Sequence, residues 1–324
     1  MRRRDRLGRA VRLAALLAIG LTLGLGGGAT YAAFSWTTSN GANAFATDTD
    51  WTAPTATSVI ARTTATVGGS ISQGSAYYVY GNATDAGNPP SGIASVRADV
   101  SNLTSGQTNV ALATAGGPWT IGGVSYAYRS ASLTANAVLL PGRKTYTLTA
   151  SDAHTPANAA TQSFSVTVDN SFPSGGDIQA NVGNGIPEAG DRLVFTFSEA
   201  MDTSSILSGW SGASTPVQVL MVNGGCGAND SATVQDSGGG TGVHLGTVCV
   251  GDIVNGNRSF TSSTMTLSGA GTIVTVTLGG NPGGTKAAAN TTLVWTPSAL
   301  ATDVAGNGCS VVPVTESGGL DTDF

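Results

Sequence analysis

Short runs in which apolar and polar residues alternate fill the chain from residue 51 onward. The run IASVRADV (93–100) places its small apolar side chains on one face, namely Ala94, Val96, Ala98 and Val100. The runs TYTLTA (145–150) and SFSVTV (163–168) alternate in the same way. A period of two is typical of half-buried strands, and no stretch after residue 32 has a clear helical period. The pattern predicts an all-β fold.

Turn-forming clusters divide these runs into two groups. DAGNPPSG (85–92) and ATAGGPW (113–119) separate neighbouring runs, and NSFPSGG (170–176) reads as a linker. Six to eight short strands in about 120 residues are typical of an immunoglobulin-like sandwich. We therefore expect two tandem sandwich domains, at residues 51–172 and 173–324.

The composition fits exported β-sandwich proteins. Only 10% of the residues are charged, and 46 of 324 are glycine, whereas an ordinary globular chain has about 25% charged residues and about 7% glycine. An apolar content of 40% argues against disorder, because disordered chains lack apolar residues.

The first 32 residues are typical of a signal peptide that forms an apolar helix. A basic segment with six arginines precedes an apolar segment from Leu13 to about Leu25. Thr30 and Ala32 are small residues placed for cleavage between Ala32 and Ala33. A retained membrane anchor is the alternative, but the apolar stretch is shorter than the roughly 20 residues of a span. We expect cleavage, an extended mature N-terminus at 33–50 and no stable membrane span.

The mature chain is acidic. Loss of residues 1–32 leaves eight Lys and Arg against eighteen Asp and Glu. With a net charge near −10 and no basic stripe, the chain is not expected to bind nucleic acid or anionic lipid.

The mature N-terminus resembles the SipW-dependent precursors of Gram-positive bacteria, which include biofilm-fibre and camelysin-like proteins. The matching residues are Ala33, Phe34, Ser35, Thr37, Asn40, Gly41, Asn43 and Phe45. The acidic residue usual after the Phe-Ser pair is Trp36 here. The resemblance implies export to the cell surface or the extracellular matrix.

The two expected domains resemble bacterial Ig-like modules. APTATSV (53–59) and SFSVTVDNSFP (163–173) are similar to the start and end of bacterial Ig-like repeats. RLVFTFSEAMDTSSI (192–206) and LVWTPSALATDVAGN (293–307) are similar to the Ig-like module of surface and S-layer-type proteins. The resemblance implies that these segments are scaffold.

Glu199 and Asp202 follow an apolar strand and have the spacing of a possible acid/base pair. A glycosidase needs two carboxyl groups about 5–10 Å apart across a cleft, and no second acid is placed opposite these two. Asp and Ser near a strand end usually form turns. We therefore expect buried Phe195 and Phe197, exposed and dispensable acids, and no catalytic residue.

Two histidines do not favour a hydrolase. His154 lies in the loop SDAHTPAN and His244 in the predicted strand GVHLGTV. One histidine per domain cannot build the two- or three-histidine zinc sites of metallohydrolases, and no G-x-S-x-G motif accompanies either one. The sequence therefore predicts that the protein is not an enzyme.

Calcium is the metal for which the loops offer the best candidate ligands, because several of them contain aspartate. Exported Ig-like and cadherin-like modules often hold Ca²⁺ at their junctions through aspartates, and oxygen ligands in loops suit that ion. The aspartates in turns or near the linker are Asp85, Asp152, Asp169 and Asp177. No spaced Asp-x-Asp-x-Asp loop occurs, and lone loop aspartates usually form turns. We therefore predict no metal and no cofactor.

Three cysteines allow three single bridges. A hairpin that turns at glycines 238–240 would bring Cys226 near Cys249, and export favours oxidation. This pairing is our prediction. It leaves Cys309 as a free or intermolecular thiol.

The sequence as a whole favours a non-catalytic, secreted or cell-surface structural or adhesive protein whose protein or glycan partner is unknown. A carbohydrate-binding sandwich of the envelope or matrix is the alternative, because sugars stack on exposed rings. The candidate rings are Tyr77, Tyr78, Tyr80, Trp119, Tyr126 and Tyr128. A secreted hydrolase has no motif to support it.

Overall fold

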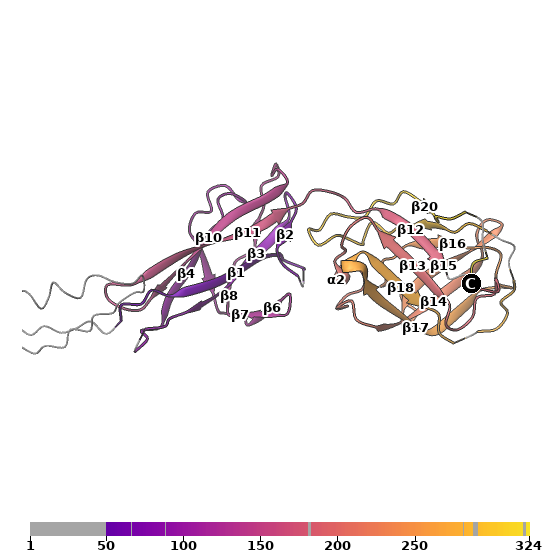
Figure 1. The fold of residues 1–324 in the computed structure, drawn as a ribbon, viewed down its shortest axis with the longest axis horizontal. Coiled ribbons are helices and arrows are strands. Elements are labelled where there is room, and N and C mark those ends of the chain that lie inside the picture. Colours follow the sequence, from indigo (N-terminus) through magenta and orange to yellow (C-terminus); the bar gives the residue numbers. More distant parts are fainter. Residues whose placement is uncertain are drawn as a thin grey trace, which may run out of the picture. The chain divides into compact units, whose positions relative to one another are not determined.

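The computed structural model describes residues 50–324, except 66, 88, 181–182, 281, 288–290 and 320–321. Nearly all of its regular structure is β, as predicted (Figure 1). The predicted signal peptide, its predicted cleavage point between Ala32 and Ala33, and the segment 33–49 lie outside the described residues. Within those residues no helix is long and apolar enough to span a membrane.

The first module, defined here as residues 50–168, contains strands β1 to β11. A nine-stranded sheet has the order β1-β3-β8-β5-β4-β10-β11-β2, with β9 on β3, and β6 pairs with β7 in a separate hairpin. The strands are β1 Thr55–Arg62, β2 Ser70–Ile71, β3 Ala76–Thr84, β4 Ile93–Asp99, β5 Val110–Ala113, β6 Trp119–Ile121, β7 Val124–Tyr126, β8 Tyr128–Ser130, β9 Leu133–Thr134, β10 Gly142–Asp152 and β11 Ala159–Val168.

The second module, defined as residues 169–324, contains strands β12 to β20. Its nine-stranded sheet has the order β12-β13-β18-β17-β14-β15-β16-β19-β20. The elements are β12 Gly175–Ala180, β13 Arg192–Phe197, α2 Thr203–Ile206, β14 Thr215–Cys226, β15 Asn229–Asp236, β16 Thr247–Cys249, β17 Arg258–Ser268, η1 Gly269–Gly271, β18 Ile273–Thr277, β19 Val294–Thr296 and β20 Val314–Thr315. The predicted domain boundary at 172/173 falls in the strand-free stretch between β11 and β12.

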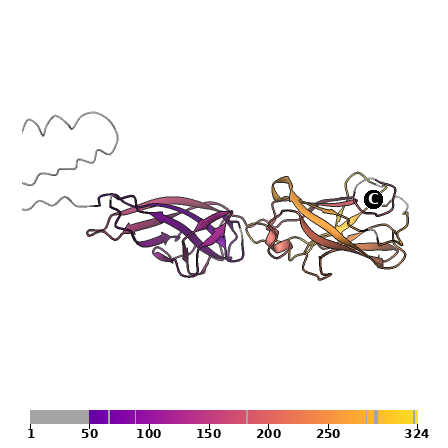
Figure 2. The ribbon, with the colours of Figure 1, turned by 90° about the horizontal axis from the view of Figure 1, so that it is seen from below.

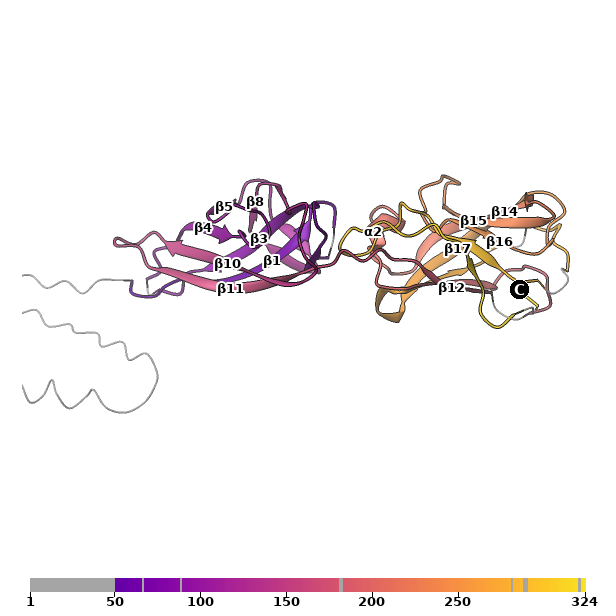
Figure 3. The ribbon, with the colours of Figure 1, turned by 90° about the horizontal axis from the view of Figure 1, so that it is seen from above.

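Each sheet folds back on itself, so its first strand lies beside its last ones. In the first module β1 contacts both β2 and β11, and Figure 3 shows β1 beside β11. In the second module β12 contacts β19 and β20. The view in Figure 2 shows the strands of each module on both sides of its interior. The two-residue period of the strands therefore points one row of side chains into an enclosed core.

Most of the core residues named here are those that the alternation predicts, but Ala94, which was expected on the same face as Val96, is exposed. Val96, Ala98 and Val100 are buried, as are Tyr146 and Leu148 on β10. In the second module the buried alternating row is Leu193, Phe195 and Phe197. The rings of Phe195 and Phe197 both meet Trp295 edge to face, with centroids 5.2 and 5.0 Å apart. Such contacts add about 0.5–1.5 kcal/mol to the burial of each ring.

Candidate functional site

Three aspartates from separate parts of the first module converge on one point, which we call triad 1. Asp50 precedes β1, Asp85 directly follows β3, and Asp152 is the last residue of β10. One carboxylate oxygen from each lies within 4.8 Å of the others. Asp50 and Asp152 are buried, and Asp85 is half-buried.

Backbone amides compensate much of the charge of triad 1. Asp50 accepts hydrogen bonds from the amides of Thr52 at 3.1 Å and Ser91 at 3.0 Å. Asp85 accepts one from the Gly92 amide at 2.7 Å. Hydrogen bonds from Ser91 and Thr52 lower the pKa of Asp50, because they favour its charged form.

The second module has an equivalent cluster, which we call triad 2, of Asp169, Glu199 and Asp303. Asp169 precedes β12, Glu199 follows β13, and Asp303 lies in the loop after β19. Their carboxylate oxygens also lie within 4.8 Å of one another. Asp303 is buried and the other two acids are half-buried. Both modules thus carry one acid before the first strand, one after the strand that pairs with it, and one late in the module, at the end of β10 or in the loop after β19.

Triad 2 is electrostatically less favourable than triad 1. Burial, followed by the charges of Asp303 and Asp169, raises the pKa of Glu199. Burial also raises the pKa of Asp303, against the hydrogen bonds that it accepts from Asn307 and Gly306. Glu199 accepts no hydrogen bond from the residues that the structure describes. Glu199 is therefore the acid of triad 2 whose charge has no donor among the described residues.

The donor sets of both triads fit a calcium ion. Calcium takes oxygen ligands at 2.3–2.6 Å, so two ligand oxygens on one ion are at most about 5 Å apart, and both triads satisfy this limit. The residues that would hold the ion are Asp50, Asp85 and Asp152 in the first module and Asp169, Glu199 and Asp303 in the second. A bound ion would neutralise the clustered charge and tie three separate segments together.

Of the four aspartates that the sequence singled out for calcium, three belong to a triad. Asp85 and Asp152 are in triad 1 and Asp169 is in triad 2. Asp177 lies in neither, because its carboxylate accepts hydrogen bonds from Ser317 at 2.9 and 2.8 Å. The sequence reasoning did not identify Asp50, Glu199 and Asp303 as ligand candidates. One sequence signal was available for Asp303. It is followed four residues later by Asn307, just as Asp152 is followed six residues later by Asn158.

Asp202 has a different role from Glu199, and the expectation of an exposed carboxylate was wrong. The residue is buried, and its Oδ1 accepts a hydrogen bond from the Ser204 amide at 3.0 Å, which caps α2. Its Oδ2 forms an ion pair with Arg62 at 2.5 Å. A capping acid typically stabilises a helix by about 1 kcal/mol. Asp202 is therefore structural, but it is not the dispensable surface acid that the strand-end pattern predicted.

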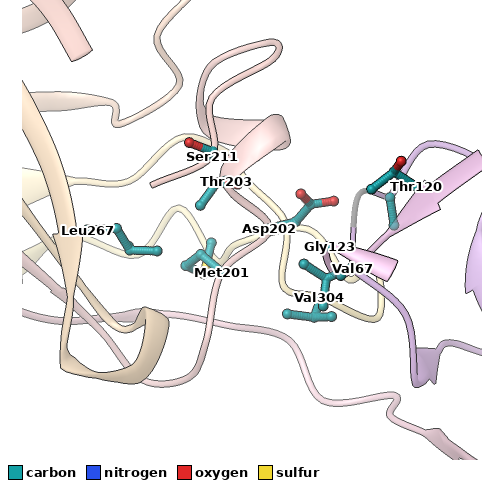
Figure 4. Close-up of a pocket in the computed structure, with 11 residues that line it drawn as sticks. Val67, Thr120, Gly123, Met201, Asp202, Thr203, Ser211, Leu267 and Val304 are labelled. Carbon is teal, nitrogen blue, oxygen red and sulfur yellow. The ribbon is translucent and has the colours of Figure 1, made fainter. Parts of the chain in front are cut away.

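A cavity of about 490 Å³ lies beside Asp202 (Figure 4). Its lining is mainly apolar or glycine, and the residues are Ala65, Val67, Thr120, Gly122, Gly123, Met201, Asp202, Thr203, Ser211, Leu267 and Val304. Because Arg62 already holds the Asp202 carboxylate, the cavity presents no acid and base placed for catalysis among these residues.

Three of the six candidate sugar-stacking rings are buried inside the fold. Tyr77 lies in the main core, while Tyr80 and Tyr126, the last residue of β7, are buried together in a smaller cluster. The half-buried rings are Tyr78, Trp119 and Tyr128. The Arg129 guanidinium lies 4.2 Å from the ring centre of Tyr78 and 4.4 Å from that of Trp119. Two of the three remaining rings therefore already pair with an arginine.

His154 adjoins triad 1, because its backbone amide donates a hydrogen bond to Asp152 Oδ1 at 3.2 Å. The ring Nδ1 of each histidine lies beside a backbone carbonyl. His154 Nδ1 is 2.8 Å from the carbonyl oxygen of Pro156, and His244 Nδ1 is 2.7 Å from that of Ser205. His244 lies outside the strand expected for it, because β16 begins at Thr247.

The predicted disulfide between Cys226 and Cys249 is confirmed, with a Cα–Cα distance of 5.7 Å. The predicted hairpin, in which the two cysteine strands would pair directly, was wrong. Cys226 ends β14 and Cys249 ends β16, and both strands pair with β15 between them. The turn at glycines 238–240 joins β15 to β16 rather than the two cysteine strands directly. Cys309 is a buried free thiol, and burial, then the charge of Glu199, raises its pKa to about 11.

Comparison with known proteins gives no match, either to a protein-family model or to a curated protein sequence.

Proposed function

We propose that this chain is a non-catalytic, extracellular structural or adhesive protein of Gram-positive bacteria, built from tandem Ig-like modules. In this proposal each module binds a divalent cation, with calcium as the expected ion, where the chain enters its sandwich. The signal-like N-terminus and the SipW-type pattern support export. The duplicated triad is the observation that carries the proposal.

The position of the triads favours a mechanical role. In both modules the first acid precedes the first strand, and the other two acids belong to the body of the sandwich. A cation held by all three would fix the incoming segment to the module. Fixing successive segments in this way stiffens a chain of modules, which suits a spacer, a fibre subunit or a presenter of adhesive surfaces.

Calorimetric titration of the secreted chain with Ca²⁺ tests the cation site. We expect binding at two sites per chain, loss of one site in Asp303→Asn, and no loss in Asp177→Asn. The second variant is a matched control, because Asp177 is an acid of the same module outside the triad. Absence of calcium binding by the wild-type chain would overturn the cation part of the proposal.

Export and adhesion are tested separately. Mass spectrometry of the secreted protein should find an N-terminus at Ala33, and a pull-down with cell-wall and matrix preparations should retain the chain. A glycan array distinguishes the carbohydrate-binding alternative. Sugar binding that is lost in Trp119→Ala would favour that alternative over the structural proposal.

A further inference from the structure

Each triad is accompanied by an asparagine that makes the same three hydrogen bonds. In the second module the Asn307 amide donates to Asp303 Oδ1 at 2.7 Å. Its side-chain nitrogen donates to Asp303 Oδ2 at 2.8 Å and to the carbonyl oxygen of Asp169 at 3.0 Å. One asparagine thus contacts two acids of triad 2, one through its carboxylate and the other through its backbone.

The first module repeats this arrangement with another loop. The Asn158 amide donates to Asp152 Oδ1 at 2.8 Å. Its side-chain nitrogen donates to Asp152 Oδ2 at 2.7 Å and to the carbonyl oxygen of Asp50 at 3.1 Å. The loop lengths differ, since Asn158 is six residues after its aspartate and Asn307 only four. The same contacts are therefore built from two unrelated loop sequences.

We propose that Asn158 and Asn307 are positioning residues, which latch the segment before each module's first strand to the late loop and so bring Asp50 and Asp169 into their triads. The expected effect on calcium affinity rests on the proposed function. The latch between the two segments rests on the hydrogen bonds of Asn158 and Asn307 alone. Both side-chain hydrogens of each asparagine have an acceptor, one on the loop acid and one on the incoming backbone. An aspartate could not replace it, because a carboxylate has no hydrogen to donate and would add another negative charge.

Calcium affinity and local backbone protection together test the proposal on the full mature chain. Residues that orient metal ligands typically contribute 10–100-fold to affinity. We expect Asn307→Ala to weaken one of the two calcium sites about tenfold or more, and Asn158→Ala to weaken the other. Asn82→Ala is the matched control. Asn82 also bonds two backbone groups, Ser125 and Ala127, but it contacts no triad.

Hydrogen exchange in EGTA examines the latch without the cation. In Asn307→Ala we expect faster exchange in a peptide covering 169–175 and no change in one covering 50–56, and the reverse in Asn158→Ala. Affinities within twofold of wild type in both variants, or equal exchange in the two peptides, would overturn the positioning role. If the wild-type chain binds no calcium but the local exchange effects appear, the cation proposal fails and the latch stands.

Discussion

Triad 1 and triad 2 have the same plan but different electrostatics. In triad 1, hydrogen bonds from Ser91 and Thr52 lower the pKa of Asp50. In triad 2, burial and neighbouring charge raise the pKa of Glu199, and burial raises that of Asp303. Equal spacing of carboxylates therefore does not mean equal cost of holding them charged. The hydrogen bonds around Asp50 favour its charged form, whereas the surroundings of Glu199 and of Asp303 favour the protonated form of each.

The largest expected effect in the second module comes from its core. Phe197 is 3% exposed, two residues before Glu199, so Phe197→Ala should destabilise that module by about 3–5 kcal/mol. Calorimetric melting of the full chain measures this loss and identifies which transition belongs to the second module. Phe172→Ala is the control, since the Phe172 side chain is 71% exposed and should matter by less than about 0.5 kcal/mol. A similar loss in both variants would contradict the assigned core.

The disulfide distinguishes the two modules in stability, because among the described residues only the second module has one. In the chain-entropy model, closing a loop of about 24 residues stabilises the folded state by about 3 kcal/mol. Cys226→Ser/Cys249→Ser should therefore lower the transition identified by Phe197→Ala and leave the other unchanged. Equal shifts of both transitions would show that the bridge acts outside its own module.

Calcium should stabilise both modules, and one acid in each should control its effect. At a calcium concentration 100 times its dissociation constant, binding stabilises the folded state by about 2.7 kcal/mol. We expect Asp303→Asn to abolish the calcium-dependent rise of the second transition only, and Asp152→Asn to abolish that of the first. Melting each variant in EGTA and in calcium measures these increments. A calcium increment that persists in both variants would place the cation elsewhere.

The smallest effect is a pH dependence of opposite sign in the two modules without cation. A carboxyl whose pKa is raised on folding contributes stability below its usual value, 4.5 for Glu199, and loses that contribution as pH rises through the raised value. The lowered pKa of Asp50 works the other way, so its contribution is lost on acidification. Melting in EGTA above pH 4.5 should show Glu199→Gln gaining stability over wild type as pH rises. A difference independent of pH would contradict the charge repulsion in triad 2.

Sequence alternation predicted the strands better than it predicted the triads. The rows of β4, β10 and β13 depend on neighbouring residues, so a period of two was enough to place Val96, Leu148 and Phe195 in the core. The triads depend on segments more than 100 residues apart, such as Asp50 and Asp152, which only the folded sandwich brings together. Loop aspartates therefore read as simple turn formers.

Two wrong predictions, the hairpin around the disulfide and the exposure of Asp202, have the same cause. The glycine run 238–240 was correctly read as a turn, but the sequence does not show that β15 lies between the two cysteine strands. Asp202 was read as a surface acid because its partner Arg62 is 140 residues earlier. Both errors concern contacts whose partners lie on strands or loops that are not adjacent in sequence.

The disulfide across β15 also limits how far the second module can be stretched. Its cysteines are 23 residues apart in sequence and 5.7 Å apart in space. At about 3.3–3.6 Å per extended residue, the bridge withholds about 70–77 Å of contour length from a chain pulled at its ends. Under tension, the oxidised second module would therefore extend in a shorter step than the reduced one, and the segment containing β15 would remain closed after the rest of the sandwich had unfolded.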